Sequence, residues 1–333
     1  MYLLAIESSC DDTSVAVVHN GVLLCNIVSS QLVHNTFGGV VPEMASREHL
    51  KNIVWVADAA LQEAGITTRQ LGAVAVTAGP GLPGSLMVGV SFAKGLALSL
   101  KKPLIAINHM EAHILSLLIQ QPAPRFPFLC LVVSGGHTML VVVKNWNQMA
   151  ILGQTKDDAV GEAFDKCAKL LGLGYPGGKA IDDLARKGNP DAFAFPVGVV
   201  DGYNFSYSGV KTAVMYFVRE KGEAFVQAQL ADICASIQRA LLKPLVQKSV
   251  LAMKQYDLSQ IGIAGGVAAN SGLRHWLSEI CSQNNAELFV PDYQYCTDNA
   301  GMVGFAAWHK WQSGDFASPG MVTQPRLVVG QPL

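Results

Sequence analysis

The sequence predicts an α/β protein of two lobes that begin in the same way. Apolar runs at 2–6, 14–18 and 22–28 are separated by short polar turns, a pattern typical of a three-strand antiparallel meander. The same order of strand, polar turn, strand and strand returns at 128–155. Because helical patterns follow each meander, we expect a duplicated α/β unit.

The length and one proline-rich segment define the expected domains. A chain of 333 residues can form two domains, or one domain of two lobes. The segment Pro122–Pro127 interrupts the pattern and marks the boundary. We expect an N-terminal lobe at 1–122, a C-terminal lobe at 127–295, and a helix and tail at 296–327 that return toward the N-terminal lobe and a ligand cleft.

Composition indicates a soluble, cytoplasmic protein without membrane contacts. Half of the residues are hydrophobic and the formal net charge is −1, so no global basic field signals nucleic acid. The seven cysteines are scattered without a Cys-x-x-Cys pair, which fits a reducing compartment. The longest apolar stretch, Leu86–Leu100, contains Lys94 and is shorter than a bilayer span. The first twelve residues carry no basic leader.

The N-terminal lobe combines a polar turn, two helices and a glycine-rich loop. The turn Glu7–Thr13 is either a solvated hairpin or a holder for a metal-bound phosphate. A helix is expected from Pro42 to Gly65, and its apolar stripe predicts core packing or a partner surface. The stripe comprises Leu50, Ile53, Val54, Ala57, Leu61 and Ala64. The loop Ala78–Ser85 matches neither common phosphate-binding spacing, and we interpret it as a tight turn.

A pair of histidines follows the short apolar strand 103–107. On a helix, His109 and His113 share one face, so both imidazoles can bind one ion. Ligands bind at the carboxyl ends of strands in open α/β sheets, which favours a metal pair, although a solvated helix face remains the alternative. The zinc-peptidase motif has its glutamate directly after the first histidine. Glu111 lies one position later, which argues against peptidase chemistry.

Asp298 is the candidate for the third metal ligand. It precedes the last helical pattern and would complete a site of two histidines and one carboxylate. The alternative is a helix-capping role, because Thr297-Asp298-Asn299 is also typical of a helix start.

The C-terminal lobe has its own polar first turn, Ser134–Thr138. Gly135 and Gly136 expose backbone donors, while Ser134, His137 and Thr138 add side-chain donors. This turn could address the same ligand as the first turn of the other lobe. A Gly-Gly hairpin without function is the alternative.

Two later positions in this lobe are candidates for ligand binding. Asp165 lies inside an acidic helix and near the glycine pair of Tyr175–Gly178. A strand at 261–264 ends in a second glycine-rich turn, where Asn270 is placed to hydrogen-bond a ribose or a base.

Seven motifs stand in the order known from one family, and the match runs from residue 2 to about 327. They are Ile6–Thr13, Asn108–His113, Val133–Thr138, Gly161–Lys166, Tyr175–Gly178, Ala264–Asn270 and Cys296–Asn299. The chain resembles the tRNA adenosine threonylcarbamoyltransferases, and in particular their bacterial catalytic subunits; the family was once called glycoproteases. The resemblance implies a two-lobed actin-like, sugar-kinase-like (ASKHA) fold with the nucleotide in the cleft.

The resemblance also implies the reaction and the partners. Members transfer the threonylcarbamoyl group of threonylcarbamoyl-AMP to the exocyclic amine of the adenosine beside the anticodon. The substrates are tRNAs that read codons beginning with adenine, and AMP is released. Bacterial members bind a related non-catalytic protein through the N-terminal lobe and cooperate with a small ATPase.

By position in these motifs, the resemblance assigns His109, His113 and Asp298 as ligands of one divalent ion, Fe²⁺ or alternatively Zn²⁺. The substrate-binding set that it implies is Val133, Ser134, Gly135, Gly136, His137, Asp165, Gly178, Asp182 and Asn270. Two positions depart from the family pattern. Asp12 stands where glutamate is frequent, and Lys179 stands where proline often follows the glycine pair.

The chemistry of the reaction agrees with these assignments. An exocyclic amine is a weak nucleophile, so the acyl carbonyl must be polarised by a cation and by aimed backbone donors. We expect Asp11 to accept the amine proton, with His137 as a second catalytic candidate. Rival functions are a small-molecule kinase of the same fold, a metallopeptidase and a non-catalytic subunit. The kinase does not need the histidine pair, and the non-catalytic subunit would be expected to lack a ligand.

Overall fold

The computed structural model describes residues 1–331, apart from the side chains of Leu32, Asn35 and Thr36. The chain forms two compact units. One unit contains Met1–Gln121 together with the chain from Asp292 onward, and the other contains Pro122–Pro291. Asp298 therefore belongs to the same unit as the histidine pair.

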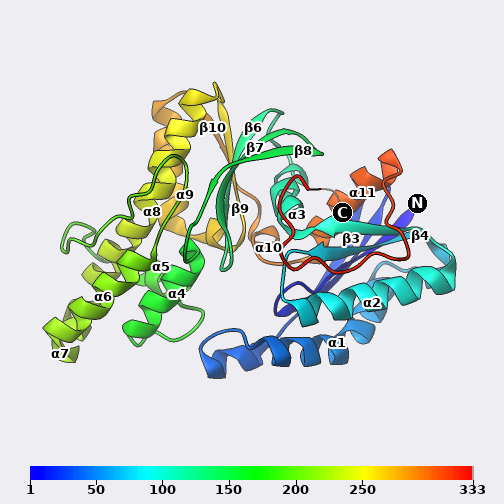
Figure 1. Cartoon of the computed structure of the whole chain (residues 1–333), viewed down its shortest axis with the longest axis horizontal. Coiled ribbons are helices and arrows are strands. Elements are labelled where there is room, and N and C mark those ends of the chain that lie inside the picture. Colours follow the sequence, from blue (N-terminus) through cyan, green and yellow to red (C-terminus); the bar gives the residue numbers. More distant parts are fainter. Residues whose placement is uncertain (332–333) are drawn as a thin grey trace. The chain divides into compact units, whose positions relative to one another are not determined.

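The first unit is built on a five-stranded sheet in the order β3-β2-β1-β4-β5 (Figure 1). Its strands are β1 (Tyr2–Glu7), β2 (Asp12–His19), β3 (Val22–Ser30), β4 (Leu71–Gly79) and β5 (Leu104–Asn108). The first three strands form the predicted antiparallel meander, and β4 and β5 continue the sheet in parallel with β1. The carboxyl ends of β1, β4 and β5 therefore meet at one edge.

Helices cover both faces of this sheet. They are α1 (Pro42–Glu63), α2 (Pro83–Leu100), α3 (His109–Leu115), α10 (Tyr293–Cys296) and α11 (Ala300–Ser313), with 3₁₀ turns η1 (Leu32–Phe37), η2 (Thr68–Gln70) and η3 (Ser116–Leu118). Side chains alternate along a strand. Leu4 and Ile6 accordingly join a core cluster with residues of α1 and α2, whereas Ala5 faces Gly304 of α11.

The second unit repeats this topology. Its sheet has the order β10-β9-β6-β7-β8, formed by β6 (Phe128–Val133), β7 (Thr138–Asn145), β8 (Gln148–Gln154), β9 (Gln260–Ala264) and β10 (Glu287–Phe289). The meander β6-β7-β8 is antiparallel, and β9 and β10 extend it in parallel. The predicted duplication is confirmed. Strand β10 is not predicted from the sequence, because it is short and lies at the edge of the sheet.

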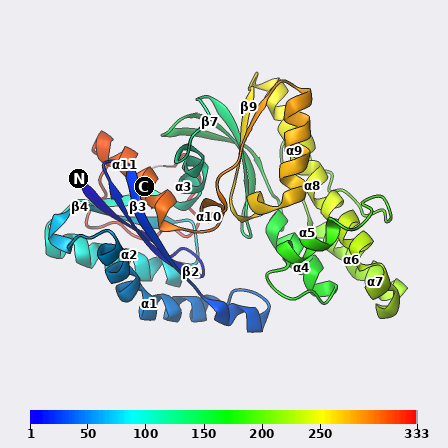
Figure 2. The same cartoon turned by 180° about the vertical axis from the view of Figure 1, so that it is seen from behind.

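Helices of the second unit extend from the sheet, and Figure 2 shows α8 and α9 running alongside one another. They are α4 (Val160–Leu170), α5 (Gly177–Ala185), α6 (Ser208–Lys221), α7 (Glu223–Ala228), α8 (Leu230–Gln255) and α9 (Ser271–Gln283), with the 3₁₀ turn η4 (Gly266–Ala269). Both α4 and η4 lie beside the end of β6. The glycine-rich turns of this unit therefore gather at one edge of its sheet.

One helix, α2, has the length and apolar composition that a membrane crossing would need. It packs against α1 and β4, and core helices of soluble proteins share these properties.

Candidate metal centre

The two histidines are placed by a capped helix directly after β5. The side chain of Asn108 accepts hydrogen bonds from the backbone N–H groups of Met110 at 2.9 Å and Glu111 at 3.3 Å, which fixes the start of α3. The rings of His109 and His113 then lie edge to face with centroids 4.7 Å apart. His109 is 7% exposed and His113 is fully buried. The predicted common face of the pair is therefore present in the fold.

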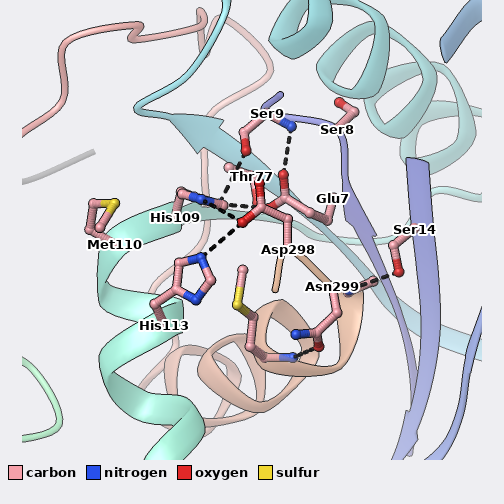
Figure 3. Close-up of polar contacts among 12 residues, drawn as sticks. Glu7, Ser8, Ser9, Ser14, Thr77, His109, Met110, His113, Asp298 and Asn299 are labelled. Carbon is pink, nitrogen blue, oxygen red and sulfur yellow. Dashed lines mark hydrogen bonds and ion pairs between the residues drawn. The ribbon is translucent and has the colours of Figure 1, made fainter. Parts of the chain in front are cut away.

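Asp298 brings a carboxylate to both imidazoles (Figure 3). Its Oδ1 lies 3.0 Å from His113 Nε2 and 3.5 Å from His109 Nε2. The alternative capping role belongs to the next residue, because the side chain of Asn299 accepts a hydrogen bond from Met302 N at 3.0 Å. The Asp298 side chain, 24% exposed, is thereby left available to a ligand.

These three side chains form a group that can hold a metal ion. One ligand atom from each lies within 4.8 Å of the others, and no other such group of His, Cys, Asp or Glu occurs within residues 1–331. Two imidazole nitrogens and one carboxylate oxygen fit Fe²⁺ or Zn²⁺ and leave coordination positions open. The donor set thus matches the kind of ion expected from the sequence.

A second carboxylate, Glu7, lies behind His109. Its Oε2 is 3.0 Å from His109 Nδ1 and accepts a hydrogen bond from Thr77 Oγ1 at 2.5 Å. Its Oε1 accepts one from Ser9 N at 2.5 Å. The sequence alone does not distinguish Glu7 from the other polar residues of the first turn, and it gives no reason to select Thr77. Only the pairing of β1 with β4, and of β4 with β5, places them together.

The charges of Glu7, Asp298 and His109 shift the pKa values of these groups so that each group favours its charged form. Burial alone would lower the pKa of His109, but the carboxylates of Glu7 and Asp298 outweigh it and raise this pKa well above its ordinary value. Burial alone would raise the pKa of both carboxyl groups. The charge of His109 reverses this effect and lowers the pKa of Glu7 and, more strongly, that of Asp298.

The acidic pair of the first turn adds negative charge nearby. Burial raises the pKa of Asp12 to about 7, opposed by a hydrogen bond with Ser30 and assisted by the charges of Asp298, Asp11 and Glu7. These carboxylates therefore act on one another electrostatically. A concentration of negative charge of this kind attracts cations.

The predicted turn Ser134–Thr138 connects β6 to β7 and is stabilised by hydrogen bonds within the turn and by contact with the start of α4. Ser134 N donates to His137 O at 2.8 Å, and His137 N donates to Ser134 Oγ at 3.0 Å. A Cβ atom at Gly161 would lie 2.6 Å from Ser134 O, so the start of α4 is pressed against the turn. At Gly135 and Gly136, by contrast, an added Cβ would meet nothing within 4 Å.

Three further predicted binding residues, Asp165, Asp182 and Asn270, form hydrogen bonds at the starts of α5 and α9. Asp165 Oδ1 accepts a hydrogen bond from Gly177 N at 2.8 Å, at the start of α5. Asp182 accepts from Ser271 N at 3.1 Å and from Ser271 Oγ at 2.8 Å. The side chain of Asn270 caps α9 and donates to Gln238 Oε1 at 2.8 Å. Gly178 is open, since an added Cβ would have only Phe164 Cβ nearby, at 3.9 Å.

The fold and the three candidate ligands define an ASKHA-type α/β protein with a histidine–histidine–aspartate group. Solved structures agree on the fold. Component A of (R)-2-hydroxyglutaryl-CoA dehydratase from Acidaminococcus fermentans gives a TM-score of 0.56 at 15% identity, covering 94% of this chain and 98% of that one. Full-length HypF in its phosphate- and nucleotide-bound form gives 0.62 at 13% identity, covering 95% of this chain and 47% of that one. At these identities the likeness establishes the fold alone.

Sequence comparison identifies the family. The profile of tRNA N6-adenosine threonylcarbamoyltransferase matches residues 22–305. Relatives of that name are 50% identical in Cytophaga hutchinsonii, covering 98% of this chain and 96% of the relative, and 52% identical in Christiangramia forsetii, covering 97% of each. The chain belongs to the tRNA N6-adenosine threonylcarbamoyltransferase family and is an acyltransferase that modifies tRNA. The kinase and peptidase alternatives are not favoured.

Proposed function

We propose that the chain performs a metal-assisted acyl transfer. The donor is threonylcarbamoyl-AMP, and the acceptor is the exocyclic amine of the adenosine beside the anticodon in tRNAs that read codons beginning with adenine. AMP is the leaving group. His109, His113 and Asp298 hold one divalent ion, Fe²⁺ in the first instance and Zn²⁺ as the alternative. The observation that carries this proposal is the group of three ligand atoms within 4.8 Å of one another.

When bound, such an ion polarises an acyl or phosphoryl oxygen as a Lewis acid. The chain's own residues bind and orient the substrates. The open backbone at Gly135 and Gly136, held by the hydrogen bonds of Ser134 and His137, suits the approach of a phosphoryl or acyl oxygen. Val133 completes this turn, with its carbonyl against Gly265.

The adenosine part of the donor is assigned to the helix ends of the second unit. Asp165, Gly178, Asp182 and Asn270 lie on or against α5 and the start of α9, where connected hydrogen bonds hold their side chains in place. Such pre-positioned acceptors, together with the open space beside Gly178, suit a ribose and a base.

For the amine proton we propose Asp11 as acceptor, with His137 as the second candidate. Asp11 lies in the turn between β1 and β2, in the unit that carries the metal-binding group. Each carboxylate of this pair has a hydrogen-bond partner, Ser30 for Asp12 and the thiol of Cys10 for Asp11, so the choice of Asp11 rests on its place in this turn.

The partner surface is proposed on α1 and α2. The apolar stripe of α1 splits in the fold: Ile53, Ala57 and Leu61 are buried, whereas Leu50 and Val54 remain 64% and 55% exposed. Trp55 of α1 and Met87 and Leu98 of α2 are exposed as well. We assign this surface to the related non-catalytic protein, which works with a small ATPase. Leu86 of α2 does not belong to this surface because it is fully buried, and Phe92 is partly buried against the core.

A cytoplasmic location is part of the same proposal. The seven cysteines are all free thiols, as a reducing compartment would keep them.

The test is a reconstitution. The chain, loaded with Fe²⁺ or Zn²⁺, is mixed with threonylcarbamoyl-AMP, unmodified tRNA and the two partner proteins. We expect threonylcarbamoyladenosine in the digested tRNA by mass spectrometry, and none after chelation of the metal. Equal product formation by the metal-free chain would contradict metal assistance, and absence of product under all conditions would contradict the assigned donor.

A further inference from the structure

We infer that Glu7 is a positioning residue that holds His109 in the tautomer and orientation needed to bind the metal ion through Nε2. The inference rests on the proposed metal site and deepens it. Glu7 is the last residue of β1, and its side chain is fully buried. It therefore acts on the site through its neighbours.

The carboxylate of Glu7 joins three strand ends (Figure 3). It accepts hydrogen bonds from Ser9 N, just beyond β1, and from Thr77 Oγ1 on β4, and it contacts His109 Nδ1, which follows β5. Each of its oxygens thus already accepts from a donor that belongs to the fold. A carboxylate used in this way has only acceptor positions to offer His109.

This arrangement fixes which nitrogen of His109 carries the hydrogen. Because Glu7 accepts, Nδ1 must donate, and the hydroxyl oxygen of Ser9 lies 3.2 Å from the same nitrogen. Nε2 is then left as the ligand atom, 3.5 Å from Asp298 Oδ1. Metal-binding histidines are commonly oriented by a carboxylate on the far ring nitrogen, and loss of that carboxylate weakens metal binding.

The second histidine lacks such support. His113 Nδ1 is buried and has no hydrogen-bond partner among the described residues. The two imidazoles are therefore unequal at Nδ1: that of His109 contacts the Glu7 carboxylate, whereas that of His113 has no hydrogen-bond partner among the described residues. Of the groups that are not themselves proposed ligands, Glu7 should therefore have the largest influence on the geometry of the pair.

Glu7→Gln tests this dependence with little change in shape. The amide that this substitution introduces can lie in two ways. In the first orientation its NH₂ group takes the place of Oε1 and faces Ser9 N, which is itself a donor. In the second it takes the place of Oε2 and faces Thr77 Oγ1 and His109 Nδ1. The first orientation loses a backbone hydrogen bond, and the second favours the tautomer with hydrogen on Nε2. Glu111→Gln is the matched control, since Glu111 lies on α3 between the two histidines and accepts instead from Gly330 N at 2.9 Å.

The measurements use the full chain, stripped of metal and titrated with Zn²⁺ against a chelator, and with Co²⁺ followed by its visible absorption. We expect Glu7→Gln to bind Zn²⁺ roughly 10- to 100-fold more weakly than wild type and to give an altered Co²⁺ spectrum, while Glu111→Gln matches wild type. Zn²⁺ affinity within about 2-fold of wild type and an unchanged Co²⁺ spectrum in Glu7→Gln would overturn the inference. Failure of wild type and Glu111→Gln to bind either ion would instead overturn the proposed metal site.

A second measurement does not use Glu7→Gln, in case that variant does not fold. Nitrogen-15 NMR of histidine-labelled, Zn²⁺-loaded wild type reports which ring nitrogen carries hydrogen, and His109 is assigned by its absence in His109→Ala. We expect His109 to carry hydrogen on Nδ1 and metal on Nε2. Metal on Nδ1 would refute the role of Glu7.

Discussion

His113 Nε2 lies 3.0 Å from Asp298 Oδ1, although 185 positions separate the two residues in the chain. The contact depends on the return of the C-terminal segment to the first unit, where α11 packs against β1 and β2. Metal binding should therefore report on the integrity of this unit.

Removal of the Asp298 carboxylate should abolish the site while leaving the fold in place. In Asp298→Ala we expect transfer activity to fall by at least about 100-fold, because even groups outside the metal's own ligands are commonly worth 10- to 100-fold. Metal content by mass spectrometry and transfer in the reconstituted mixture are the measurements. Asp315→Ala is the control, since Asp315 pairs with Lys310 at 2.9 Å on the surface of the same unit. Full metal occupancy in Asp298→Ala would contradict the assignment.

The two glycine positions at the turn of the second unit should respond differently. Gly136→Val adds a side chain in open space, so we expect stability within about 0.5 kcal/mol of wild type but weaker binding of threonylcarbamoyl-AMP. Gly161→Ala places its Cβ against Ser134 O and should destabilise the protein by more than that. Urea denaturation and calorimetric titration with the adenylate measure the two effects. Unchanged adenylate affinity in Gly136→Val would move the binding site elsewhere.

Charged residues placed on the exposed apolar surface of α1 should disturb binding of the partner protein without disturbing the metal site or the fold. For Leu50→Asp and Val54→Asp we expect reduced activity in the reconstituted mixture, with unchanged metal binding and little change in stability. Leu251→Asp is the matched control, because Leu251 is 52% exposed on α8 of the other unit. Efficient multiple-turnover modification of tRNA by the purified chain alone would count against the need for this surface.

His49 should make part of the stability depend on pH. Its Nδ1 lies 2.7 Å from Thr13 Oγ1 and its Nε2 lies 2.9 Å from Cys10 O, so it ties α1 to the turn after β1. Burial lowers the pKa of His49 in the folded protein. As pH falls below about 6.5, the ordinary value, the unfolded chain binds the proton first. The contribution of His49 is therefore complete above that pH and is lost as pH falls toward the lowered pKa.

The comparison of wild type with His49→Gln isolates this effect. At pH 7.5 we expect the substitution to cost about 1–3 kcal/mol, because it disturbs buried hydrogen bonds. Urea denaturation at pH 7.5, 6.5 and 5.5 should show the difference between the two proteins shrinking toward acid. A difference that stays constant or grows would refute the lowered pKa.

The sequence by itself determined the class of fold, the duplication and the histidine pair. Each of these depends on short-range regularities. Alternating apolar runs specify strands, helical spacing places His109 and His113 on one face, and Pro122–Pro127 interrupts the pattern between the repeats. Strand β10 could not be predicted from the sequence, because an edge strand of three residues carries little periodic signal.

Only the tertiary structure decided which polar residues complete the site. From the sequence, Asp298 could be a ligand or a helix cap, and the fold gives the cap to Asn299. Glu7 was one acidic residue among several in its turn, until the pairing of β1 with β4, and of β4 with β5, placed it between Thr77 and His109. The order and register of strands are set by contacts between distant segments, which local patterns do not encode. The same reason explains why the apolar stripe of α1 divides into buried and exposed faces only once the helix is packed on its sheet.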